Sequence, residues 1–204
     1  MKYTQFYSQW HQFACFSTAQ VAAIYPDFNR GNYLQWQKAG YIVSLRRGWY
    51  AFTDYLGQPD YASYFATKIY TPAYISLHSA LAFYDIIPEA VIDITCVTTL
   101  KTARFSNPFA YYSYQTIRPD LFWGYEPKTM LDGKTYLMAT PEKAILDLLY
   151  LYPYRTPQDM IDLRLDEHFM QSDFNKDTIL SFAQRANKPA LLDRINTLLK
   201  AYSL

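Results

Sequence analysis

Cysteine and glycine are scarce in this chain, and long apolar runs are absent. Among 204 residues there are two cysteines, Cys15 and Cys96, and six glycines. Two cysteines cannot build a disulfide framework, which favours a reducing compartment. No stretch approaches the length of a membrane span, and the first ten residues, MKYTQFYSQW, contain no unbroken apolar run. We therefore expect a cytoplasmic protein without a signal peptide and without membrane contact.

Catalytic and metal-binding signatures are equally scarce. The three histidines, His11, His78 and His168, fall in separate predicted helices, and no His, Cys, Asp and Glu cluster has metal-ligand spacing. The sequence contains no glycine-rich phosphate loop, no nucleophile elbow and no Cys/His pair. Asp147 lies in a mostly apolar predicted helix, where it is either a buried acid or part of a polar face. We expect no catalytic residue, no metal and no cofactor, and hence no enzyme.

One stretch nevertheless allows a catalytic alternative. Asp120, followed by Glu126-Pro127-Lys128, is similar to the acid and acid-x-lysine arrangement with which metal-dependent nucleases hold Mg²⁺. Proline is poorly suited to a central strand, and the spacing leaves little room for a turn between the two acids. A nuclease therefore stays open as the weaker hypothesis.

Aromatic residues and an uneven charge are what the chain does have. Tyr, Phe and Trp make up 19% of it, with 21 tyrosines, whose rings pack while their hydroxyls stay in water. Residues 1–55 carry five basic and two acidic side chains, whereas the remainder carries 14 and 16. This asymmetry predicts that any polyanionic partner binds the first part of the chain.

The first forty residues predict three helices. Residues 3–14 place apolar side chains at helical spacing. Ser17 is a suitable N-cap for a short second helix, which Pro26 stops. After this break, Asn29 can cap a third helix, and Gly40 supplies its left-handed C-terminal stop.

A hairpin follows at once. Tyr41–Leu45 and Trp49–Phe52 read as two strands around the turn Arg46-Arg47-Gly48. Helix, short helix, tight turn, helix and hairpin is the order of a winged helix-turn-helix, in which the helix after the turn enters the DNA major groove. The plain alternative is a small surface helix with ordinary solvated polar groups.

The predicted third helix carries side chains suited to DNA. Its candidate contacts are Asn29, Arg30, Asn32, Gln35 and Lys38. Arginine, asparagine and glutamine can read purine edges, and lysine can meet phosphate. Arg46 and Arg47 would contact phosphates from the hairpin. Because so few basic residues allow few phosphate contacts, we expect tight binding to need two copies on repeated DNA sites.

Residues 54–60 contain glycine and proline and predict a boundary, which divides the chain into 1–55 and 56–204. Beyond it we expect helices over 61–70 and from Ser76, strands over 91–99 and 109–117, a hairpin turning at Asp132-Gly133, a helix beginning at Thr140-Pro141 and a helical tail from Pro157. This order predicts a mixed α+β domain with a small, mainly antiparallel sheet and a helical C-terminal tail.

Three tyrosines in the strand over 109–117 leave two possibilities open. Tyr111, Tyr112 and Tyr114 could present an aromatic face that stacks bases or holds a partner protein. The alternative is that one face of the sheet packs under the helices.

Three segments together resemble a known family. LQWQKAGYIVSLRRGWYAF at 34–52, YISLHSALAFYDIIPE at 74–89 and ATPEKAILDLLY at 139–150 occur in the order found in AbiEi-type antitoxins, the regulators of type IV (AbiE) toxin–antitoxin systems. The first segment matches that family's pattern at Lys38, Gly40, Ile42, Arg46 or Arg47, Gly48 and Tyr50.

The resemblance implies a DNA-binding antitoxin. Its winged helix would bind double-stranded promoter DNA and repress its own operon, and its second domain would counter a separately encoded nucleotidyltransferase-like toxin. The competing hypothesis is a protein-interaction module that does not bind DNA.

Overall fold

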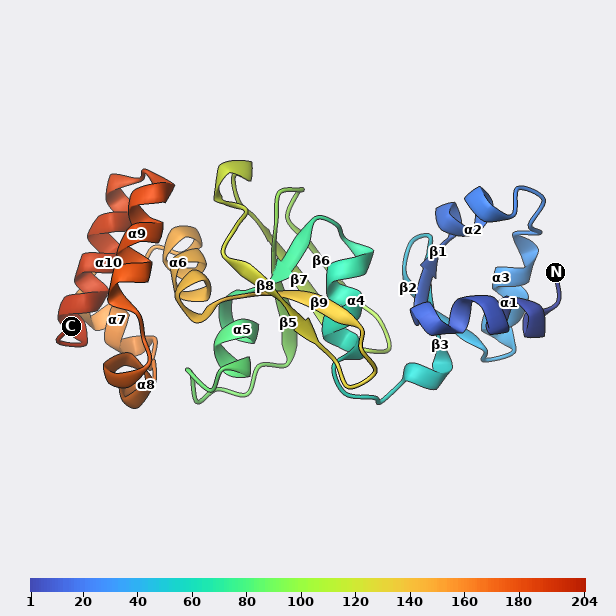
Figure 1. Cartoon of the computed structure of the whole chain (residues 1–204), viewed down its shortest axis with the longest axis horizontal. Coiled ribbons are helices and arrows are strands. Elements are labelled where there is room, and N and C mark those ends of the chain that lie inside the picture. The colour runs from blue at the N-terminus through green and yellow to red at the C-terminus, as the bar shows by residue number, and fades with distance from the viewer.

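Three groups of elements follow one another along the longest axis of the computed structural model, which describes residues 1–204 (Figure 1). The N-terminal helices and a small sheet form one end, a six-stranded sheet lies in the middle, and the C-terminal helices form the other end. The expected α+β fold class is confirmed. None of the helices combines the length and the apolar character needed to cross a membrane.

The N-terminal end, which we call the N-terminal elements, covers residues 1–55. It contains α1 (Tyr3–Trp10), η1 (His11–Phe13), β1 (Cys15–Ser17), α2 (Thr18–Ile24), α3 (Gly31–Lys38), β2 (Ile42–Arg46), β3 (Trp49–Phe52) and η2 (Thr53–Tyr55). The strands form an antiparallel sheet in the order β1-β3-β2. Ser17 caps α2 as predicted, because its hydroxyl accepts from the Gln20 amide while the Gln20 side chain accepts from the Ser17 amide. Gly40 ends α3 with a φ of 74°.

One local prediction needs correction, and one strand is missing from the predictions. The N-cap of α3 is Arg30 rather than Asn29, and the Asn29 side-chain oxygen instead accepts from the Gly31 amide at 2.9 Å. Strand β1 is not predicted from the sequence, since its three residues are all buried and show no alternation. Their pairing with β3 makes them a strand.

Phe6 is the centre of the core beneath these elements. Its fully buried ring has centroids of Trp10, Phe16 and Trp36 at 5.5, 4.8 and 4.9 Å. Phe28 and Phe52 complete the shell at 5.7 and 6.2 Å. One ring therefore joins α1, the strands and α3, and aromatic pairs at such distances add to ordinary apolar burial.

The middle of the molecule is a mixed sheet. Its strands are β4 (Ala73–Ile75), β5 (Asp93–Thr98), β6 (Ala103–Ser106), β7 (Tyr111–Thr116), β8 (Tyr125–Thr129) and β9 (Thr135–Ala139). The order is β6-β7-β5-β4-β9-β8, with β4–β9 and β5–β7 parallel and the other three pairs antiparallel. The sheet is thus larger than expected, and its short strands β4 and β6 are not predicted from the sequence.

The strand tyrosines divide between the two faces of the sheet. Tyr112 and Tyr114 are buried, and the Tyr114 hydroxyl donates to the Ala66 carbonyl of α4 (Tyr61–Ile69) at 2.9 Å. Tyr111 is 61% exposed. Burial in the core therefore accounts for two of the three tyrosines, and one of them, Tyr114, packs against a helix.

A buried ion pair holds α6 (Pro141–Leu151) against the centre of the sheet. Lys143 donates to Asp147, whose carboxylate also accepts from the hydroxyls of Tyr74 and Ser76, both at 2.8 Å. Burial lowers the pKa of Lys143 and raises the pKa of Asp147, whereas their contact favours the charged form of each. Asp147 is therefore a buried acid. Its carboxylate accepts hydrogen bonds from one ammonium and two hydroxyls, and a buried charge needs such partners.

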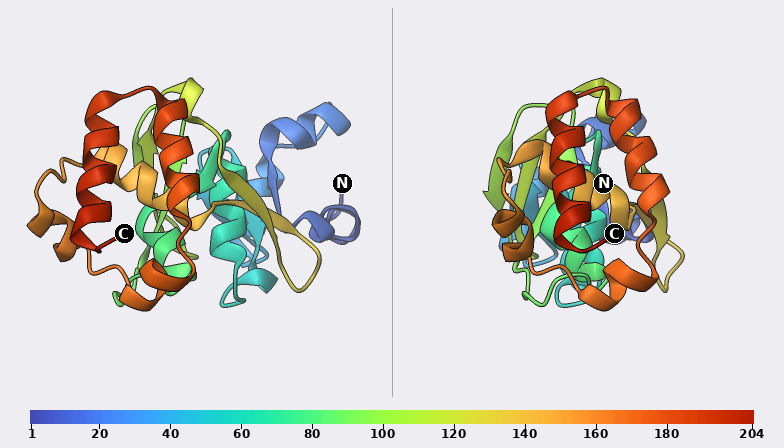
Figure 2. Two further views of the ribbon diagram at one scale, coloured as in Figure 1. Left: turned by 60° about the vertical axis from the view of Figure 1, so that its left-hand side comes forward. Right: turned by 90° about the vertical axis from the view of Figure 1, so that its left-hand side faces the viewer.

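The C-terminal tail belongs to the same core. It consists of α7 (Pro157–Asp162), α8 (Glu167–Ser172), α9 (Lys176–Ala186) and α10 (Pro189–Ala201). Helices α9 and α10 lie side by side, which both views of Figure 2 show. Arg194 donates to the Leu149 carbonyl at 2.6 Å, and the Arg185 guanidinium stacks on Trp123 at 4.3 Å. The helical tail is therefore confirmed and is anchored to α6 and the sheet.

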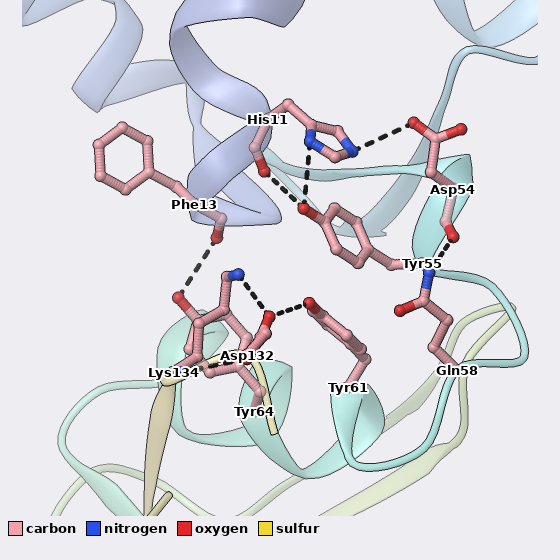
Figure 3. Close-up of polar contacts among 9 residues, drawn as sticks. All are labelled: His11, Phe13, Asp54, Tyr55, Gln58, Tyr61, Tyr64, Asp132 and Lys134. Carbon is pink, nitrogen blue, oxygen red and sulfur yellow. Dashed lines mark hydrogen bonds and ion pairs between the residues drawn. The ribbon is translucent and has the colours of Figure 1, made fainter. Parts of the chain in front are cut away.

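Tyrosines join the N-terminal elements to the middle sheet (Figure 3). The Tyr55 hydroxyl donates to the His11 carbonyl at 2.7 Å, and the Tyr55 ring lies 4.3 Å from that of Tyr61. Tyr61 in turn donates to Asp132, which also accepts from the Lys134 ammonium at 2.6 Å. Partial burial alone would raise the pKa of Asp132, but these bonds lower it to about 2, so the acceptor stays charged at neutral pH.

We predict that Phe6→Ala destabilises the protein strongly. Removing the ring leaves a cavity among side chains of α1, α3 and the strands, which should lower the free energy of unfolding by about 3–5 kcal/mol. Urea denaturation measures this change. Phe83→Ala is the matched control, because Phe83 is exposed and its truncation should cost less than about 1 kcal/mol. Equal losses in the two variants would contradict the central role of Phe6.

Candidate nucleic-acid interface

Helix α3 has one buried and one exposed side. Tyr33 and Trp36 are buried, and their rings lie 5.0 and 5.7 Å from that of Phe28. Burial raises the pKa of Tyr33 to about 12, so its phenol stays neutral. Gln35 and Lys38 are exposed on the other side. The aromatic anchors therefore fix which side chains α3 presents to solvent.

The five side chains predicted to contact DNA on and before α3 differ in exposure and in hydrogen bonding. Arg30, Gln35 and Lys38 are exposed, as a base or phosphate contact requires. Asn29 is exposed too, but its side-chain oxygen is engaged by the Gly31 amide. Asn32 is half-buried, and its amide nitrogen lies 3.4 Å from the Met1 carbonyl. Three of the five side chains are thus free of protein hydrogen bonds.

A groove of about 520 Å³ runs between α2 and α3. It is lined by Thr18, Ala19, Ala22, Arg30, Tyr33, Leu34, Gln37 and Tyr50. Thr18 and Gln37 are absent from the predicted contacts. The sequence could have indicated Gln37 through its spacing from Arg30, because residues seven apart fall on one face of a helix.

The hairpin turn lies against the start of α2. The Gly48 carbonyl accepts from the Thr18 amide at 2.8 Å, and Gly48 has a φ of 78°, which favours glycine. Arg47, the other residue of the turn, is exposed. The structure therefore brings Arg47 to the same end of α2 as Thr18, which lines the groove.

Arg46 has a different environment. Its guanidinium stacks on Tyr70 at 4.3 Å, lies 5.2 Å from the ring of Phe105 and donates to the Ile69 carbonyl at 3.4 Å. A bulge between Ser44 and Arg46 shifts the register of β2 against β3 at this point. Arg46 is therefore engaged in protein contacts, whereas the phosphate role predicted for it assumes a free side chain.

The charge of this surface is positive and unneutralised. Arg30, Lys38 and Arg47 take part in none of the six ion pairs of the structure. Of the two acids in residues 1–55, Asp54 is paired with His11, whose Nε2 lies 3.3 Å away, and Asp27 is exposed. Unpaired cations beside a groove are suited to attracting an anionic partner.

The residues of the nuclease hypothesis lie elsewhere. Asp120 accepts from Arg118 Nε at 2.9 Å, and Glu126 and Lys128 lie 3.5 Å apart on β8. Strand β8 is an edge strand, where Pro127 is tolerated. Nowhere in the chain do three or more His, Cys, Asp or Glu side chains form a group suited to a metal ion.

We predict that the two neighbouring arginines differ in their effect on stability. Arg46→Ala removes the stacking and the hydrogen bond at the Ile69 carbonyl and should lower the free energy of unfolding by about 1–2 kcal/mol. Arg47→Ala is the matched control and should change it by less than about 0.5 kcal/mol. Urea denaturation of both variants tests this, and equal effects would show that Arg46 does not hold the hairpin to the middle sheet.

The chain was compared with protein-family models and with curated proteins. No protein-family model matches the chain, and no curated protein matches it. The exposed side of α3, with its unpaired cations, and the groove beside it are the features from which a function can be argued.

Proposed function

We propose that the protein is a transcriptional regulator that binds double-stranded promoter DNA through residues 1–55, acting as a winged helix-turn-helix. The observation that carries this is the exposed side of α3, where Arg30, Gln35 and Lys38 are exposed above the aromatic core of Phe6. A rigid helix with free long polar side chains meets the physical requirement for reading base edges in a major groove.

Within this proposal, each exposed side chain has a role in DNA binding. Arg30 and Gln35 approach base edges, because both can form two hydrogen bonds with a purine. Lys38 and Arg47 neutralise backbone phosphates. Gln37 and Thr18 line the groove between α2 and α3. One copy makes few phosphate contacts, so tight binding uses two copies on repeated half-sites.

The second half of the proposal concerns residues 56–204. The resemblance of three segments to AbiEi-type antitoxins supports an antitoxin that represses its own operon in the cytoplasm and counters a nucleotidyltransferase-like toxin. The two later segments contribute the buried partners Ser76, Lys143 and Asp147. In this chain they maintain the core of the middle sheet, so a toxin would contact the surface around them.

We predict distinct effects of phosphate and base contacts on DNA binding. Arg47→Ala should weaken binding to every duplex and reduce the slope of log K against log salt by about 1. Gln35→Ala should cost about 1–3 kcal/mol on the preferred site alone. Gel shifts with the DNA upstream of the gene and with an unrelated duplex, at several salt concentrations, measure both effects.

Lys176→Ala is the matched control for these variants. Lys176 is the first residue of α9, which lies at the opposite end of the molecule, and it forms no ion pair (Figure 1). Its substitution therefore removes one positive charge, as Arg47→Ala does, without changing the interface. If Arg47→Ala and Lys176→Ala lower the salt slope equally, general charge rather than this surface attracts DNA. If neither duplex binds at all, DNA is not the partner.

One observation favours the second candidate, a protein-interaction module. Leu34, 59% exposed, lies in the middle of the exposed side of α3 and lines the groove beside Arg30. Exposed leucine is more typical of protein contacts than of DNA contacts. Co-expression with the neighbouring gene product distinguishes the two: the second candidate predicts a protein complex that Leu34→Ser weakens, and no gel shift with either duplex.

A further inference from the structure

A second groove lies between the N-terminal elements and α4, on the other side of α2. It encloses about 490 Å³ and is lined by Trp10, Phe13, Cys15, Gln20, Ala23, Ile24, Trp49, Tyr64 and Lys68. Pockets of this size, lined by aromatic and aliphatic side chains and placed where two packed units meet, are typical of small-ligand sites. The first groove, in contrast, is lined by more polar side chains.

The walls of this second groove are apolar and partly open to solvent. Phe13 is 51% and Ile24 60% exposed, although both are large apolar side chains. Trp10 and Trp49 add indole rings from α1 and β3. An apolar ligand would therefore remove from water a surface that the folded chain leaves uncovered.

A single charge faces this apolar surface. Lys68 is the only charged residue of the lining, and its ammonium lies 5.1 Å from the centre of the Tyr64 ring. Lys68 forms no ion pair. Burial raises the pKa of the Cys15 thiol to about 12, so the thiol adds no charge. The groove thus offers one uncompensated positive charge and no negative one.

We propose that this groove binds a small amphiphilic carboxylate, with its apolar body between Phe13, Ile24 and the two indoles and its carboxylate on Lys68. A charged hydrogen bond at the rim of an apolar groove orients such a ligand and selects against neutral and cationic analogues. This site is separate from the proposed DNA surface, and its existence does not depend on DNA binding.

Helix α2 connects the two grooves. Gln20, Ala23 and Ile24 line the carboxylate site, while Thr18, Ala19 and Ala22 line the groove beside α3. The two grooves therefore share α2 as a common wall.

Decanoate, below its micellar concentration, is the probe. The chain has four tryptophans, and two of them line the groove. In ¹⁵N NMR spectra of the full chain, decanoate should shift the indole signals of Trp10 and Trp49 and leave those of Trp36 and Trp123 in place. Calorimetry should show that decanol, which lacks the charge, binds about tenfold more weakly.

Three variants complete the test. Lys68→Gln should remove the preference for decanoate over decanol, while the matched control Lys101→Gln, at an exposed lysine outside the groove, should keep it. Ala23→Trp should block both ligands by filling the groove. No shift at Trp10 and Trp49, equal binding of decanoate and decanol to the wild-type chain, or unchanged decanoate affinity in Lys68→Gln would each overturn the proposal. The NMR shifts and the calorimetric affinities do not depend on DNA binding. The carboxylate proposal and the DNA-binding proposal can therefore be contradicted independently of each other.

Discussion

The packing around Phe6 is the constraint on which the candidate interface depends. Its ring contacts aromatic side chains from α1, α3 and the three-stranded sheet, so the orientation of α3 is set by aromatic packing. Because Trp36 and Tyr33 are anchored in that core, the opposite side of α3 has to carry the solvent-facing residues. The proposed readout by Arg30 and Gln35 therefore follows from apolar burial before any charge is considered.

The junction between the N-terminal elements and the middle sheet is a second constraint. Arg46 ties the hairpin to Tyr70 and Phe105, and Tyr55 and Tyr61 connect the η2 segment to the Asp132 turn. The hairpin is thus held between α2 and the sheet rather than being free to move alone. These contacts fix how the N-terminal elements sit on the middle sheet.

Local features are well predicted from the sequence, and non-local ones are not. The capping of α2 by Ser17 and the stop of α3 at Gly40 depend on neighbouring residues only, so pattern and residue type suffice. Strands β1 and β4 are three residues long and wholly buried, and only pairing with distant strands defines them. At the candidate interface, the exposure of Gln35 and Lys38 agrees with the prediction, whereas Asn32 is half-buried and apolar Leu34 is exposed. The separation of Arg46 from Arg47 is not, because the rings that hold Arg46 come from other parts of the chain.

Selection of binding sites from a pool of random duplexes, with the chain of 204 residues, tests the central claim most directly. We predict enrichment of one motif whose most constrained positions are purines, present as two half-sites, and loss of the preference at one position when Gln35→Ala is used instead. Recovery of the same motif with Gln35→Ala would contradict base reading by α3. A pool that remains random after repeated rounds would contradict sequence-specific DNA binding itself.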